Sequence, residues 1–137
     1  MVGHYVADGS QPLHTSIHFN GWSTSANPQL FTREPLHWRF EGEFVKAQIK
    51  PEDFSGLVKT ATALQDPFAD IVKYLFQTYD RVPELYRMDK TARWDATNRN
   101  AASKKFVTER LAAGSQMLAN LWYTAWLGSA SNKPEGR

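Results

Sequence analysis

The sequence AASKKFVTERLAAGSQMLANLWYTAWL, residues 101–127, is the longest stretch of the chain with one regular period. Apolar and small residues recur in it at intervals of three and four, which is the repeat of an amphipathic α-helix. Gly128 predicts the end of this helix, and Ser129–Arg137 is expected to fray. The residues that carry the period are Val107, Leu111, Gly114, Leu118, Leu121 and Ala125.

Two upstream segments have the same period and clear start signals. Asp66-Pro67 combines an N-cap with a first-turn proline and predicts a helix over Pro67–Tyr79. Pro35 opens a helix that is expected over Leu36–Ile49 and that Pro51 closes. The expected buried stripe of the Pro67–Tyr79 helix is Ile71, Val72, Leu75 and Phe76.

The other segments have weaker signals. Glycine, proline and β-branched residues interrupt their apolar patterns, so their boundaries are less sharply defined. We expect an all-α, single bundle-like domain of four to six helices over residues 1–137, with its candidate metal ligands at one end. The weaker elements are a helix tail at Val2–Asp8, helices at Phe54–Leu64 and near Met88, and a loop over Asp89–Asn100.

Aromatic residues fall in two places where they admit two interpretations. Trp122, Tyr123 and Trp126 follow helical spacing, and such residues are expected to pack in the core behind the other helices. Trp22 and Phe31 flank a long polar loop, and each could stack a nucleic-acid base or anchor the loop to the core. Anchoring is the commoner role for a single loop aromatic.

The composition limits the classes of function that are possible but does not select one of them. The 137 residues are 42% hydrophobic and 22% charged, as in an ordinary soluble domain. Sixteen basic and 14 acidic residues leave a formal charge of +2, too little to indicate a nucleic-acid binder by itself. The chain has no cysteine, so disulfides and thiolate metal sites are excluded. No signal peptide opens the chain, and no apolar run is long enough to span a membrane.

All four histidines lie in the first forty residues, and two of them are followed by an acidic residue four positions later. His4 precedes Asp8 by four residues, and His37 precedes Glu41 by four. On a helix, this spacing places both side chains of a pair on one face. His14 follows Pro12, where a helix has been stopped, and is expected to reach across to another element.

Imidazole and carboxylate together are the ligands that Zn²⁺ takes in catalytic sites, at about 2.0 to 2.2 Å and with one position open for water. A single pair of this kind is usually a solvated surface pair. Two pairs with an intervening histidine favour a metal site whose candidate ligands are His4, Asp8, His14, His37 and Glu41. His18 is expected to make hydrogen bonds or face a substrate rather than bind metal.

The stretch His4-Tyr-Val-Ala-Asp8-Gly-Ser-Gln-Pro-Leu-His14 resembles the H-x3-D-x2-Q-P-L-H signature of the zinc-dependent phospholipase C and single-strand-specific nuclease superfamily. His37-x3-Glu41 is similar to the H-x3-D/E motif that follows in that family. The gap between His14 and His37 resembles the nuclease branch, whereas a glutamate at 41 is typical of the phospholipase branch. The resemblance covers only the C-terminal part of a family member, whose fold is all-α.

The resemblance implies a role for each matched residue. His14, His37 and Glu41 would complete one zinc site, while His4 would bind a second zinc ion and Asp8, the expected catalytic residue, would bridge to a third. It also implies a secreted or periplasmic hydrolase of phosphodiesters in nucleic acid or phospholipid. The family's other ligands come from an N-terminal half that this sequence lacks, so impaired activity is expected. The alternative is a catalytically silent, zinc-stabilised helical module that needs a partner chain.

Overall fold

A computed structural model of the protein describes residues 2–131. The structure is 62% helical with no strand in that range, which confirms the all-α fold predicted from the sequence. One isolated bridge, between Phe19 and Gly21, is its only extended pairing. The elements are α1 (Val2–Asp8), the 3-10 segment η1 (Pro12–Thr15), the π-helical segment η2 (Arg39–Val45), α2 (Lys46–Gln48), α3 (Glu52–Ser55), α4 (Pro67–Tyr79), α5 (Val82–Thr91) and α6 (Ala101–Ser131).

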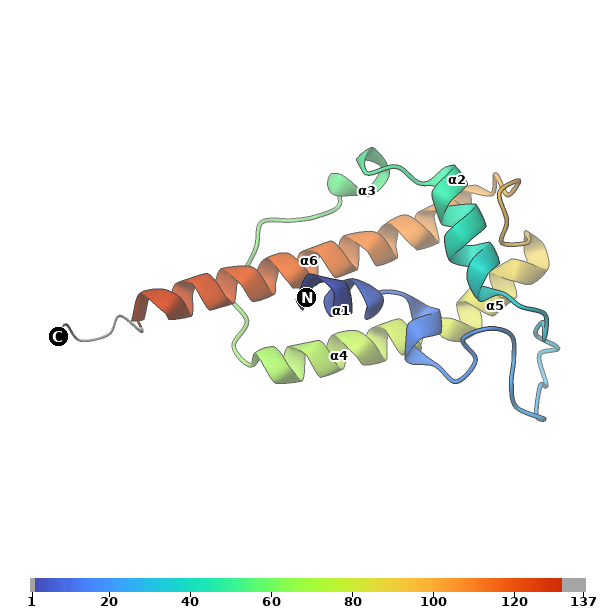
Figure 1. Cartoon of the computed structure of the whole chain (residues 1–137), viewed down its shortest axis with the longest axis horizontal. Helices are drawn as coiled ribbons and strands as arrows, with labels where there is room; N and C mark the ends of the chain where they lie inside the picture. The colour runs from blue at the N-terminus through green and yellow to red at the C-terminus, as the bar shows by residue number, and fades with distance from the viewer. Residues whose placement is uncertain (1, 132–137) are drawn as a thin grey trace.

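Helix α6 runs the length of the molecule, and the other helices are arranged along it (Figure 1). Helices α1 and α4 both contact α6, and α4 also contacts η1. The approach of α1 to α4 is close, since a Cβ atom at Gly9 would lie 2.9 Å from the side chains of Tyr74 and Leu75. Tyr74 also donates a 2.8 Å hydrogen bond to the carbonyl of Val6. Glycine at position 9 therefore lets the chain turn out of α1 while α1 stays packed on α4.

The hydrophobic core lies at the end of the bundle where η2, α5 and the start of α6 meet. Trp94 is at its centre, fully buried, and its indole N–H donates to the carbonyl of Leu85. Phe40 and Phe44 contact the Trp94 ring edge-on, at centroid distances of 4.9 and 4.8 Å. Because both phenylalanines lie on η2, the core fixes the position of the segment that carries His37 and Glu41.

A buried ion pair adds a second constraint on that segment. The guanidinium of Arg39 meets the carboxylate of Asp89 on α5 through contacts of 2.9 and 3.3 Å. Both side chains are less than 10% exposed. Asp89 also accepts the backbone N–H of Trp94, so helix η2, helix α5 and the loop at 94 share one polar contact.

The segment after α3 is not the helix predicted for Phe54–Leu64. Only Glu52–Ser55 is helical, and the chain then runs extended along α6. Its backbone N–H groups at Lys59, Thr62 and Leu64 donate to side chains spaced four apart on α6. These acceptors satisfy backbone N–H groups that a helix would otherwise have to pair, so the segment is stable in an extended conformation. Gly56 also disfavours a helix here. The acceptors are Gln116, Asn120 and Thr124.

The predicted buried stripe of α4 is also wrong. Helix α4 has the expected bounds, and the Asp66 side chain caps it by accepting the N–H of Ala69. Its buried residues are Tyr74 and Thr78, whereas Leu75 is 39% and Phe76 65% exposed. The helix is therefore rotated relative to the predicted face, so that Tyr74 points inward and donates to the carbonyl of Val6.

The end of α6 differs from the prediction in two ways. The helix continues through Gly128 to Ser131, and the hydroxyl of Ser129 donates to the carbonyl of Trp126 within it. Trp122 and Trp126 are 62% and 67% exposed, because this end of α6 extends beyond the elements that cover its first half. The predicted fray over Ser129–Arg137 is thus wrong for 129–131, and residues 132–137 lie outside the described part of the chain.

Candidate metal centre

His14 is presented by a tight turn directly after α1. Gln11 caps the 3-10 segment by accepting the backbone N–H of Leu13 at 2.6 Å, and Pro12 supplies a fixed φ at its first position. Pro12 and Leu13 are buried, whereas the following His14 side chain remains 29% exposed. The Gln-Pro-Leu triplet therefore anchors the turn and leaves the imidazole at the surface.

His37 is held by the first turn of the helix that spans residues 37–48. The side-chain oxygen of Asn20 accepts the N–H groups of both Leu36 and His37, each at 3.0 Å. It therefore satisfies two of the donors that every helix N-terminus leaves unpaired. The sequence alone does not indicate this role of Asn20, because a cap supplied from seventeen residues away leaves no local pattern.

Three candidate ligands converge, as their sequence pattern predicts. His14 Nε2 lies 3.1 Å from His37 Nε2 and 3.4 Å from Glu41 Oε1. His37 Nε2 lies 3.0 Å from Glu41 Oε2. Glu41 lies in the π-helical segment that begins two residues after His37, a rare geometry that is frequent at functional sites. In residues 2–131 these three side chains are the group of His and acidic residues that could hold a metal ion.

The separations fit a small divalent cation bound by nitrogen and oxygen. In a tetrahedral site with bonds of about 2.0 to 2.1 Å, neighbouring ligand atoms are about 3.3 to 3.4 Å apart. The observed separations of 3.0 to 3.4 Å are close to this value. The three side chains are between 26% and 40% exposed, so a fourth position at the centre is open to solvent.

Asp8 and His4 extend the group away from the three convergent ligands. Asp8 Oδ1 lies 3.3 Å from His14 Nδ1, and Asp8 Oδ2 lies 3.1 Å from His4 Nε2. A carboxylate on Nδ1 selects the imidazole tautomer whose Nε2 lone pair is free for a metal. Asp8 thus orients His14 in this structure, while His4, 75% exposed, is the outermost member of the chain of contacts.

Glu41 is oriented by a side chain that the motif contains but that sequence analysis assigned no role. The amide of Gln11 donates to Glu41 Oε1 at 3.0 Å while its oxygen accepts the N–H of Leu13. Both ends of the amide are therefore used, which fixes its orientation. Gln11 couples the turn that presents His14 to the carboxylate from the neighbouring helix.

His18 lies outside the convergent group, in agreement with the hydrogen-bonding role expected for it. Its Nδ1 accepts the backbone N–H of Ser23 at 3.1 Å, and its ring stacks on Trp22 at a centroid distance of 3.7 Å. Burial lowers the pKa of His18, which favours the neutral ring. Trp22 in turn packs against the core with Phe31, which is buried, so both loop aromatics act as anchors.

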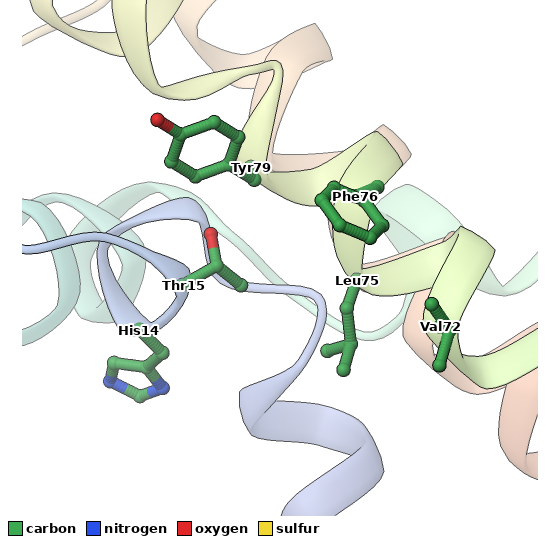
Figure 2. Close-up of a pocket in the computed structure, with 6 residues that line it drawn as sticks. All are labelled: His14, Thr15, Val72, Leu75, Phe76 and Tyr79. Atoms are coloured by element: carbon green, nitrogen blue, oxygen red, sulfur yellow. The ribbon is translucent and has the colours of Figure 1, made fainter.

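A wide groove borders the centre on the side of α4. Figure 2 shows Val72, Leu75, Phe76 and Tyr79 projecting from α4 beside the turn that carries His14 and Thr15. The groove has a volume of about 470 Å³. His14 contributes to the lining of this groove together with the exposed apolar face of α4, while its imidazole points away from Phe76 and Tyr79 (Figure 2).

Comparisons of the chain with protein-family models, with curated proteins and with solved structures give no match. Among residues 2–131, no helix combines the length and the hydropathy that crossing a membrane requires. Any function proposed for the chain therefore rests on the geometry of its residues. This geometry gives a candidate cation site that is open to solvent and has two imidazoles and one carboxylate as ligands. Neighbouring side chains orient these ligands.

Proposed function

We propose that the protein is a zinc-dependent hydrolase of phosphate esters, of the phosphodiesterase type. The observation that carries the proposal is the convergence of His14, His37 and Glu41 with ligand atoms 3.0 to 3.4 Å apart and an open side. Two imidazoles and one carboxylate are a common catalytic zinc set, and cysteine, the usual ligand of structural sites, is absent. The resemblance of the His4–His14 segment to the phospholipase C and nuclease superfamily supports the same reaction.

Zinc held by these residues would supply a bound water of lowered pKa and positive charge for the phosphoryl oxygens. The protein's own residues would set the geometry. Asp8 holds His14 in the tautomer that presents Nε2, and Gln11 holds the Glu41 carboxylate. Asn20 fixes the helix turn that carries His37. These outer partners keep the ligands in place before a substrate arrives.

The groove along α4 would receive the organic part of the ester. It begins at His14 and is lined by Val72, Leu75 and Phe76, so a phosphoryl group at the centre would place an apolar or aromatic substituent against these side chains. Phospholipid and nucleotide esters both carry such a substituent. The formal charge of +2 gives no separate preference for polynucleotide.

One observation favours a second function, that of a zinc-stabilised module without catalysis. The three ligands join the turn after α1 to the helix at 37–48, so a bound ion would tie two separate segments together. In residues 2–131 only this one group has three candidate ligands within reach of one another. A single ion used in this way would stabilise the fold, with a partner chain supplying the remaining ligands of an active enzyme.

The test is hydrolysis of bis(p-nitrophenyl) phosphate by the zinc-loaded protein, compared with His37→Ala and with the control His18→Ala, which changes a histidine outside the convergent group. The proposal predicts turnover that EDTA abolishes, that zinc restores and that only His37→Ala removes. Zinc binding with a higher melting temperature and no turnover would instead support the structural module. Absence of zinc binding would contradict both.

A further inference from the structure

A second, smaller cavity also borders the metal centre. Its volume is about 200 Å³, and Asp8, His14 and Glu41 contribute to one part of its wall. Arg110 of α6 lines the same cavity, among apolar side chains that include Phe40 and Leu111. A cationic side chain of α6 therefore lines the same cavity as three of the candidate ligands.

Among residues 2–131, no acidic side chain forms an ion pair or a hydrogen bond with Arg110. Its Nε atom is buried there without a hydrogen-bond acceptor, and the guanidinium forms no ion pair. Burial lowers the pKa of Arg110 and the positive charge of Arg81 adds to this effect, whereas Tyr74, Glu109 and Glu84 oppose it. A half-buried guanidinium without a direct anionic partner is costly, because it has lost water without gaining an ion pair.

The neighbouring carboxylates already contact other side chains. Glu109, the adjacent residue, pairs with Arg81 and with Lys105. Asp8 contacts His4 and His14, and the two oxygens of Glu41 contact histidines and the amide of Gln11. Arg110 therefore lines the cavity without an ion pair of its own, since Glu84 and Glu109, whose charges act on it from beyond ion-pair distance, both pair with Arg81.

Packing fixes the face of α6 that carries Arg110. Gly114 lies one turn further along α6, and a Cβ atom there would come within 2.9 Å of the Ser10 hydroxyl. This face therefore lies directly against the turn that follows Asp8. Arg110 reaches the centre from a rigid helix rather than from a loop.

We propose that Arg110 is the anion-binding residue of this centre, and that its guanidinium holds a non-bridging oxygen of the phosphoryl group presented to His14, His37 and Glu41. This inference rests on the proposed function for the identity of the anion. Arginine suits the task because its planar fork donates two parallel hydrogen bonds to phosphate. The substrate would supply the direct ion pair that Arg110 lacks among residues 2–131.

The experiment measures binding of inorganic phosphate to the zinc-loaded full chain by isothermal titration calorimetry. Arg110→Gln is expected to weaken phosphate binding at least about tenfold, and Arg110→Lys, which keeps the charge but loses the fork, by a smaller factor. Arg87→Gln, an exposed arginine on α5, is the matched control for loss of one positive charge and should bind as the unaltered chain does. Zinc affinity should be the same in all four proteins.

Phosphate binding by Arg110→Gln within twofold of the unaltered chain, with zinc bound, would overturn the inference. If Arg110→Gln does not fold, Arg110→Lys decides, since unchanged phosphate binding by that variant would overturn the inference equally. Arg110-dependent phosphate binding without diester turnover would uphold the anion site while the proposed hydrolysis fails. Diester turnover with a KM that Arg110→Gln leaves unchanged would support the proposed hydrolysis and overturn the anion-binding role of Arg110.

Discussion

Asp8 Oδ1 lies 3.3 Å from His14 Nδ1, and this contact turns the other imidazole nitrogen of His14 toward His37 and Glu41. Asp8 belongs to α1 and His14 to the turn after it, so the two are brought together by the tight path through Gly9 and Gln11. The contact gives the carboxylate an orienting role. A direct ligand role, which the family resemblance implies, makes a different prediction.

Asp8→Ala is expected to lower zinc affinity about 10- to 100-fold, because the His14 ring loses the partner that fixes its tautomer. Competition with a zinc-chelating dye measures the effect, with the exposed Asp80→Ala as control. An affinity within twofold of the unaltered chain would contradict the orienting role. Loss of a second zinc ion, with the first retained, would instead identify Asp8 as a ligand.

The Arg39–Asp89 pair should be essential for stability. Arg39→Met is expected to lower the free energy of unfolding by about 3 kcal/mol or more, because Asp89 is left charged and buried beside η2. Urea denaturation measures the change. Arg93→Met, which breaks the exposed pair with Glu34, should cost less than about 1 kcal/mol. Equal effects from the two substitutions would show that burial does not govern the Arg39 pair.

The extended segment after α3 should depend on individual side chains of α6. Asn120→Ala removes the acceptor of the Thr62 N–H, so this amide proton is expected to exchange with solvent about tenfold faster. Thr124→Val should act on Leu64 and leave Thr62 unchanged, which provides the matched control. Hydrogen exchange followed by NMR distinguishes the two. Uniform exchange changes along the segment would mean that it detaches as a unit.

Two buried tyrosines predict how stability depends on pH. Burial raises the pKa of both Tyr74 and Tyr86 from 10.0 to about 12. The folded state therefore keeps a proton that the unfolded chain releases near pH 10, so this contribution is full below about pH 10 and is lost as the pH approaches 12. Urea midpoints should fall over this range, and less steeply in Tyr74→Phe and Tyr86→Phe. Parallel profiles in all three proteins would contradict the prediction.

The extent to which sequence predicted this fold can be judged from α4 and the segment before it. Local signals placed α4 correctly, because the Asp66 cap and Pro67 act within one turn. The same local signals predicted the wrong buried face for α4, because that face depends on how α1 packs against α4 near Gly9. They failed again after Gly56, where the acceptors for the backbone lie nearly sixty residues away on α6.

The candidate site was predicted in part for the same reason. The spacing of His37 and Glu41 predicts their shared helix turn, and the Gln-Pro-Leu triplet indicates that His14 is anchored near them. The spacing of residues along the sequence does not predict that Asn20 and Arg110 lie beside the site. Each comes from a distant part of the chain, and only the packed structure places it beside the ligands.

The most direct test of the metal centre is a zinc titration of the unaltered chain, His14→Ala, His37→Ala and His18→Ala, with bound metal measured by mass spectrometry after dialysis. The account predicts that the unaltered chain and His18→Ala retain at least one zinc ion per chain, and that His14→Ala and His37→Ala lose it. Retention of zinc by both ligand variants at the level of the unaltered chain would contradict the account.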